Sequence, residues 1–228
     1  MTTSPASGTL RVASGDVSRE VSWILSDSSN AVAVLVLAHG AGANMHHASM
    51  TSIATELARR GVAVLRFNFP FMEGAKRPVD SRLVSTATIA AAVAQACELK
   101  PHLPLFIGGH SFGGRMASHA MLDRDLGEVR GLVFCSFPLH PAGQPGTKRA
   151  DHLDSINAPM LFLSGTRDAL AEPELLQRVI ARLGARAELV WLDTADHSYK
   201  VLKRTRTRSD SVFEELADAA ARFINRLC

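Results

Sequence analysis

The chain has 228 residues, of which 46% are hydrophobic and 21% are charged, the ordinary composition of a soluble globular protein. With 25 Lys and Arg against 22 Asp and Glu, the formal net charge is only +3, which excludes a surface built as a whole to bind nucleic acid. No run of apolar residues approaches 18, which argues against a membrane-spanning helix.

The start of the chain and its cysteines indicate a reducing compartment. Residues 1–8 lack the basic start and apolar centre of a signal peptide, so we expect a cytoplasmic protein with a flexible N-terminal segment and no membrane partner. The three cysteines are widely spaced and form no CxxC pair, which predicts neither a disulfide framework nor a zinc site.

The predicted elements alternate between strands and helices. In chain order they are strands at 9–12, 21–25 and 31–38, a helix at 49–60, a strand at 62–67, a helix at 81–99, a strand at 105–108 and a helix at 112–122. Strands at 129–135 and 159–163, a helix at 173–183, a strand at 187–192 and a helix at 209–227 follow. This alternation predicts one α/β domain over 1–228, with a mostly parallel sheet and helices on both faces.

The longest irregular stretch, residues 137–150, is rich in Pro and Gly. Irregular stretches of this length are uncommon and often functional. It is too short to form a separate lid domain of several helices, so we expect none.

A serine stands among glycines at the point where a predicted strand gives way to a predicted helix. Gly109-His-Ser-Phe-Gly113 matches the pattern G-x-S-x-G. That spacing suits a tight strand-to-helix turn, in which a strained backbone lifts the serine hydroxyl above the sheet edge and glycines prevent side-chain collisions. The alternative, an incidental serine in a Gly-rich loop, does not explain the strand before it and the helix after it. Ser111 is therefore the candidate nucleophile.

A nucleophilic serine needs a base, and the base needs an acid that orients it. Asp168 follows the predicted strand at 159–163, and His197 follows the last predicted strand. Known proteins that carry G-x-S-x-G in such a turn have the chain order serine, acid, histidine, and this chain is similar to them in that order. Asp193 and Asp196 are the alternative acids, but they share the histidine's own loop.

The other histidines have simpler interpretations. His110 precedes the serine and is expected to pack or to line a pocket, and His39 is expected to hold the first glycine loop by hydrogen bonds. His46 and His47 lack carboxylate or cysteine partners at ligand spacing, so a solvated or helix-capping role is favoured over a metal site. No metal ion and no cofactor is predicted.

The negative charge of a tetrahedral intermediate needs two N–H donors. The backbone N–H of Phe112 is the first candidate. The second is the N–H of Ala41, or of Gly42, in the loop His39-Gly-Ala-Gly-Ala43. This loop lacks the third glycine of a dinucleotide-binding fingerprint, and the chain has no P-loop Lys-Ser/Thr pair.

With these motifs, the chain resembles the small α/β hydrolases related to KAN-like and testis-expressed serine-hydrolase-like proteins, a lidless branch close to the dienelactone hydrolases. The resemblance covers nearly the whole chain. It is carried by residues 39–43 (HGAGA), 65–71 (LRFNFPF), 76–78 (KRP), 113–118 (GGRMAS), 165–168 (GTRD) and 196–198 (DHS). It implies an eight-stranded type of fold with Ser111, Asp168 and His197 as a catalytic triad. Such members usually carry Lys or Arg before the serine and Met after it, where this chain has His110 and Phe112.

These observations predict a serine hydrolase that cleaves a small carboxylic ester or thioester through an acyl-enzyme. The alternative is a binding or scaffold protein that keeps the fold without its chemistry. We expect His110, Phe69, Phe71 and Phe137 to line the substrate pocket, which should be shallow and open. Basic residues at 200–208 follow His197 and either rim the site or form a solvated loop. The only predicted partner is the small-molecule substrate; neither nucleic acid nor membrane is expected.

Overall fold

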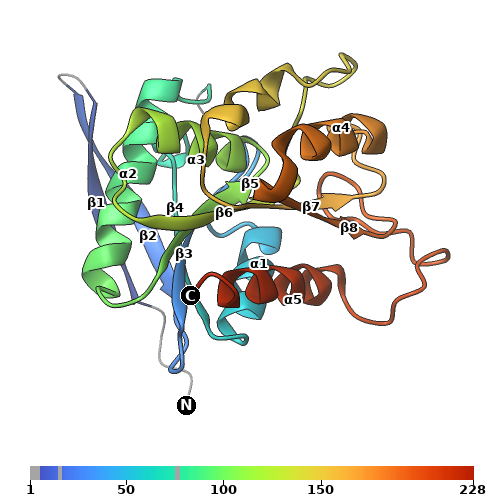
Figure 1. The fold of residues 1–228 in the computed structure, drawn as a ribbon. Coiled ribbons are helices and arrows are strands. Elements are labelled where there is room, and N and C mark those ends of the chain that lie inside the picture. Colours follow the sequence, from blue (N-terminus) through green and yellow to red (C-terminus); the bar gives the residue numbers. More distant parts are fainter. Residues whose placement is uncertain (1–5, 15–16, 75–77) are drawn as a thin grey trace.

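The computed structural model describes residues 6–14, 17–74 and 78–228 and contains one eight-stranded sheet (Figure 1). The strand order is β1-β2-β4-β3-β5-β6-β7-β8. β1 pairs with β2 and β2 with β4 in antiparallel register, and all remaining pairs are parallel. The predicted fold class, a mostly parallel sheet flanked by helices, is therefore confirmed.

The bounds of most elements lie within a few residues of the predicted ones. The strands are β1 (Ala6–Ser14), β2 (Val17–Ser26), β3 (Ala33–Ala38), β4 (Val62–Phe67), β5 (Leu105–His110), β6 (Val129–Cys135), β7 (Met160–Gly165) and β8 (Ala187–Leu192). The α-helices are α1 (Ala48–Ala58), α2 (Arg82–Leu99), α3 (Phe112–Asp123), α4 (Pro173–Leu183) and α5 (Val212–Asn225). Short 3-10 helices are η1 (Pro70–Met72), η2 (Lys148–Ser155) and η3 (Gly184–Arg186).

Two hydrophobic layers cover the two faces of the sheet. α1 and α5 pack on one face, and α2, α3 and α4 pack on the other, as the ribbon shows (Figure 1). β3 and β4 are buried at every position because helices cover both of their faces, which explains the continuous apolar run of β3. α5 begins with a capping box, in which Ser211 and Glu214 each satisfy a backbone N–H of the other.

Three expectations about local structure need correction. Residues 6–8, expected to be flexible, lie in β1 and pair with β2, because their backbone extends the antiparallel hairpin; residues 1–5 fall outside the described residues. The stretch 137–150 is not wholly irregular, because η2 begins at Lys148. α5 begins at Val212 rather than at 209. Lys76 and Arg77 also fall outside the described residues.

The parallel strands bring their carboxyl ends to one edge of the sheet, where ligands bind in α/β folds. The loops that follow β3, β5, β7 and β8 all leave from this edge. None of the described helices is both long enough and apolar enough to cross a membrane.

Candidate active site

Ser111 forms the turn between β5 and α3 and has a positive φ, with φ 53° and ψ −115°. Few residues other than glycine adopt a positive φ, and such strain concentrates at functional sites. The Ser111 N–H donates to the carbonyl of Cys135 at 2.9 Å, which anchors the turn to β6. The half-buried serine stands at the N-terminus of α3, where the helix dipole favours negative charge.

The glycines on either side of Ser111 are required by close backbone contacts. A Cβ atom on Gly109 or on Gly113 would lie 2.4 Å from the carbonyl oxygen of Ala38. A Cβ on Gly114 would lie 2.7 Å from the oxygen of Gly109. Real Cβ atoms do not approach so closely, so the glycines allow α3 to pack directly against the ends of β3 and β5. The predicted reason for the glycine pattern is confirmed.

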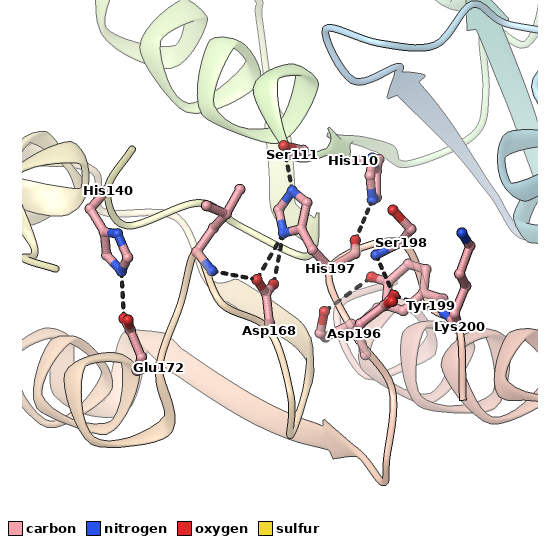
Figure 2. A network of polar contacts seen from close by, with 12 residues as sticks. His110, Ser111, His140, Asp168, Glu172, Asp196, His197, Ser198, Tyr199 and Lys200 are labelled. Atoms are coloured by element: carbon pink, nitrogen blue, oxygen red, sulfur yellow. Dashed lines mark hydrogen bonds and ion pairs between the residues drawn. The ribbon is translucent and has the colours of Figure 1, made fainter. Parts of the chain in front are cut away.

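The three side chains predicted to act together lie in hydrogen-bonding contact (Figure 2). Ser111 Oγ is 2.8 Å from His197 Nε2, and His197 Nδ1 is 2.9 and 2.8 Å from the two carboxylate oxygens of Asp168. Because the carboxylate only accepts, Nδ1 carries the proton and donates it to Asp168. This leaves the Nε2 lone pair free to accept the serine hydroxyl. Asp168 is only 2% exposed and also accepts from the Leu170 N–H at 2.8 Å.

The loops that carry Asp168 and His197 are joined by two hydrogen bonds, one between backbones and one from a backbone N–H to a side chain. The Arg167 N–H donates to the Ala195 carbonyl at 2.9 Å, and the Thr194 N–H donates to Thr166 Oγ1 at 2.9 Å. A Cβ on Gly165 would lie 2.2 Å from the Ala195 oxygen, so glycine is required where the loops cross. The relative position of acid and base is thus fixed by their backbones.

Tyr199 anchors the loop that carries His197, a role that sequence reasoning missed. Its hydroxyl donates to the Leu163 carbonyl at 3.1 Å, and its backbone has φ 63°. Burial holds the pKa of the Tyr199 phenol well above its ordinary value. The phenol therefore stays protonated and remains a donor to β7.

The alternative acids have other contacts. Asp196 Oδ1 accepts the N–H groups of Ser198 and Lys200, each at 2.9 Å, and so shapes the loop around His197. The carbonyl of Asp193 accepts from Arg206. The described contacts of His197 Nδ1 are with Asp168 alone.

His39 and His110 are neutral structural side chains. The Phe69 N–H donates to His39 Nε2 at 3.0 Å, so His39 Nδ1 carries the proton and donates to the Gly40 carbonyl at 2.8 Å. His110 Nε2 donates to the His197 carbonyl at 2.9 Å (Figure 2). Burial lowers the pKa of each to about 4. The expectation that His39 holds the glycine loop is confirmed.

The loop after β3 lies over Ser111 and forms one wall of a cavity of about 330 Å³. Ala41 and Gly42 line this cavity together with His110, Ser111 and His197. Within the described chain the N–H groups of Ala41 and Gly42 have no backbone acceptor, and the N–H of Phe112 is at the first position of α3. Leu170, His47 and Ser198 also line the cavity, although the sequence did not single them out for it.

Three of the four residues predicted to line a pocket belong to the core instead. Phe69, Phe71 and Phe137 are at most 2% exposed and do not reach the cavity over Ser111. Phe69 and Phe71 pack around His39 and Phe112, with ring centroids 5.0 to 6.0 Å apart. The apolar residues after β4 support the turn from beneath because η1 folds them inward. Only His110 lies where the prediction put it.

The basic residues at 200–208 and the pair His46 and His47 have contacts of their own. Arg206 is buried against Glu215 at 2.7 Å, Arg208 contacts the same carboxylate at 3.1 Å, and no residue of 200–208 lines the cavity. His47 caps α1 by accepting from the Ser49 N–H, and His46 is exposed. Over the described ranges, no three His, Cys, Asp or Glu side chains gather as a metal site would require.

Comparison with known proteins shows the family to which this chain belongs. Residues 31–225 match the sequence profile of a family described as an alpha/beta hydrolase domain. The chain belongs to this α/β-hydrolase family. The match includes the turn with Ser111 and the loops that carry Asp168 and His197.

Several solved structures share the fold along nearly the whole chain. A lidless α/β serine hydrolase from Xanthomonas campestris is 19% identical, with a TM-score of 0.73 over 99% of this chain and 96% of the other. A dienelactone hydrolase from Anabaena variabilis is 18% identical, with a TM-score of 0.73 over 98% of both chains. The Pyrococcus furiosus esterase Pf2001 is 18% identical, with a TM-score of 0.73 over 98% of this chain and 92% of the other. At these identities the likeness establishes the α/β-hydrolase fold, and the described elements of this chain include no separate lid domain.

Proposed function

We propose that this α/β hydrolase is a serine hydrolase that cleaves small carboxylic esters or thioesters through a covalent acyl-enzyme. The observation that carries the proposal is the line of contacts from Ser111 Oγ to His197 Nε2 and from His197 Nδ1 to Asp168. A serine hydroxyl becomes an effective nucleophile when a neutral, oriented imidazole accepts its proton.

In the first half of the reaction, Ser111 Oγ attacks the carbonyl carbon, and its proton passes to His197 Nε2. The tetrahedral intermediate collapses as the imidazolium returns the proton to the leaving alkoxide or thiolate. In the second half, water attacks the acyl carbon and gives a proton to His197, which then protonates Ser111 as the acid leaves. Asp168 holds the imidazole tautomer and stabilises the imidazolium throughout.

The charge on the carbonyl oxygen is stabilised by the N–H of Phe112 and by that of Ala41, with Gly42 as the second choice for the latter. These groups border the space above Ser111, and the first turn of α3 adds its positive dipole end. The small residues of the loop after β3 let the backbone approach the substrate.

The size of the cavity favours small substrates. About 330 Å³ is at the lower end of small-molecule sites. Since the described residues form no lid domain over it, a long acyl chain would extend into water and gain little from burial. By analogy, the esterase among the structural neighbours favours ester bonds as the class of substrate.

The proposal is tested by initial rates on p-nitrophenyl acetate, butyrate and dodecanoate and on a matched short thioester. We expect turnover of the short substrates, with kcat/KM for dodecanoate at least about tenfold lower. His197→Gln should lose about 10³-fold or more of kcat, because an amide cannot accept the serine proton.

His102→Gln is the matched control, since His102 is exposed and distant from the cavity, and it should retain wild-type rates. Absence of turnover of every ester and thioester by folded wild-type protein would instead favour a non-catalytic binding or scaffold protein.

A further inference from the structure

A second cavity, of about 900 Å³, lies between α3, η2 and the connection that follows β6. It shares no lining residue with the cavity over Ser111. Leu139 lines the second cavity and Leu170 the first, and the Leu139 N–H donates to the Leu170 carbonyl at 2.8 Å. This backbone contact forms part of the wall between the two cavities.

The Lys, Arg, Asp and Glu side chains that line the second cavity are mainly basic. Arg115 comes from α3, and Lys148 and Arg149 come from η2. Asp151 is the one carboxylate among the described lining residues, and its Oδ1 lies 3.5 Å from Nη1 of Arg182. Three cationic side chains therefore face one carboxylate that already has a partner.

Arg115 is half-buried, and its guanidinium has no hydrogen bond or ion pair with any described residue. Burial lowers the pKa of Arg115, and the positive charge of Arg149 lowers it further. Arginine nevertheless stays charged in proteins. Two guanidinium groups thus lie within electrostatic reach of each other, and an anion between them would remove both the repulsion and the desolvation cost.

The surrounding side chains hold this arrangement in place. Arg149 Nη1 donates to the His140 carbonyl at 2.9 Å, and the His140 ring is held by a hydrogen bond with Glu172. In Figure 2, His140 and Glu172 lie on one side of Asp168 and His110 lies on the other. On the other wall, the rings of His119 and His152 stack with centroids 3.8 Å apart.

Both stacked rings are uncharged at neutral pH, because burial first and nearby positive charges second lower the pKa of each to about 4. Nδ1 of His119 is buried with no hydrogen-bond partner in the described part of the chain. The histidines therefore add ring surface to the cavity without adding charge.

We propose that the second cavity binds a small organic phosphate, whose phosphoryl group is held by Arg115, Lys148 and Arg149. Guanidinium forks match the geometry of phosphate oxygens, and a dianion matches several cationic groups better than a carboxylate does. The volume greatly exceeds that of the phosphoryl group alone. The apolar side chains of Pro141 and Pro145, which are exposed at the cavity, accommodate the organic part.

The test is isothermal titration calorimetry of the full chain at pH 7.5 and low ionic strength, with phenyl phosphate as the probe. We expect saturable one-site binding that is tighter than that of inorganic phosphate, and no binding of phenol. Arg115→Gln should weaken binding about tenfold or more, since it removes a charge-assisted hydrogen bond. Inorganic phosphate binding as tightly as phenyl phosphate would contradict the organic part of the proposal.

Matched variants locate the site. Arg178→Gln removes an exposed arginine on α4 outside the cavity and should bind like the wild type, as should Ser111→Ala. Retained binding by Ser111→Ala separates this proposal from the hydrolase proposal. Lys148→Gln should also weaken binding. Because Lys148 is exposed, this variant provides the test if Arg115→Gln fails to fold. Absence of phenyl phosphate binding by the wild type, or wild-type affinity in both Arg115→Gln and Lys148→Gln, would overturn the proposal.

Discussion

Ser111 and Ser136 end neighbouring parallel strands in nearly the same way. Their φ angles are 53° and 54°, and each N–H donates at 2.9 Å to the last part of the next strand, to Cys135 and to Leu163 respectively. The residues that follow differ. Ser111 opens α3 beside a cavity and contacts His197, whereas Ser136 is fully buried and its hydroxyl has no hydrogen-bond partner among the described residues.

This difference separates backbone strain from chemistry. A positive φ at a strand end lifts a side chain out of the sheet in both places, but reactivity also requires a base, an open cavity and a helix N-terminus. At the end of β5, Gly109, Gly113 and Gly114 let α3 pack closely against the strand ends, which places the N-terminus of α3 at Ser111.

The largest effect is expected from removing the two hydroxyls one at a time. Ser111→Ala should lower kcat for p-nitrophenyl acetate by about 10⁴-fold or more, because it removes the nucleophile. Ser136→Ala should change kcat by no more than about threefold. Equal losses in the two variants would show that the comparison rests on fold stability rather than on chemistry.

The acid gives the next largest effect. Asp168→Asn should lower kcat by about 10³- to 10⁴-fold, since an amide favours the wrong imidazole tautomer. Asp196→Asn keeps an oxygen that can accept the N–H groups of Ser198 and Lys200, and it should cost less than about tenfold. A reversed order of the two variants would assign the acid to the histidine's own loop.

The glycine requirement is tested by stability. Gly109→Ala places a Cβ against the Ala38 carbonyl and should lower the free energy of unfolding by about 2–3 kcal/mol in urea titrations. A Cβ on Gly146 meets nothing within 4 Å, so Gly146→Ala should change this free energy by less than about 0.5 kcal/mol. Similar values for the two would remove the packing explanation of the Gly-rich turn.

The buried histidine beneath the turn gives the smallest effect, through pH. Burial lowers the pKa of His39 to about 4 in the folded protein, against 6.5 for a histidine in the unfolded chain. Between these two pH values the folded state therefore binds fewer protons than the unfolded state. The contribution of neutral His39 to the free energy of unfolding is complete above pH 6.5 and is lost as the pH falls towards 4. Between pH 7 and pH 5 this loss amounts to about 2 kcal/mol.

The variant His39→Gln should therefore show a pH dependence of unfolding that is smaller than that of the wild type by about this amount. His102→Gln, at an exposed position, should keep the full dependence. The same dependence in all three proteins would mean that His39 is protonated without cost.

Much of the fold follows from local patterns that the sequence displays directly. The apolar run of β3 and the alternation of strands and helices predicted the parallel sheet, because strands covered on both faces must be apolar throughout. The G-x-S-x-G turn and the chain order of Asp168 and His197 predicted which side chains meet, because parallel strands share one edge.

Other features depend on contacts between distant segments. The positive φ of Ser136 and Tyr199 has no sequence signal, since neither residue is a glycine. Phe69 and Phe71 were assigned to a pocket because they follow a strand end, yet η1 turns them into the core. The cavity around Arg115 lies between α3 and η2. It was not predicted because residues 137–150 were expected to be irregular, so no packing of η2 near α3 was foreseen.

The central claim is that Ser111 is reactive because His197 accepts its proton, whereas Ser136, which has no such base, is inert. The most direct test is intact-mass analysis after treatment with a fluorophosphonate, which reacts with activated serines and requires no knowledge of the substrate. We predict one adduct on the wild type and on Ser136→Ala, and none on Ser111→Ala. An unlabelled but folded wild type, or an adduct that persists on Ser111→Ala, would contradict the account.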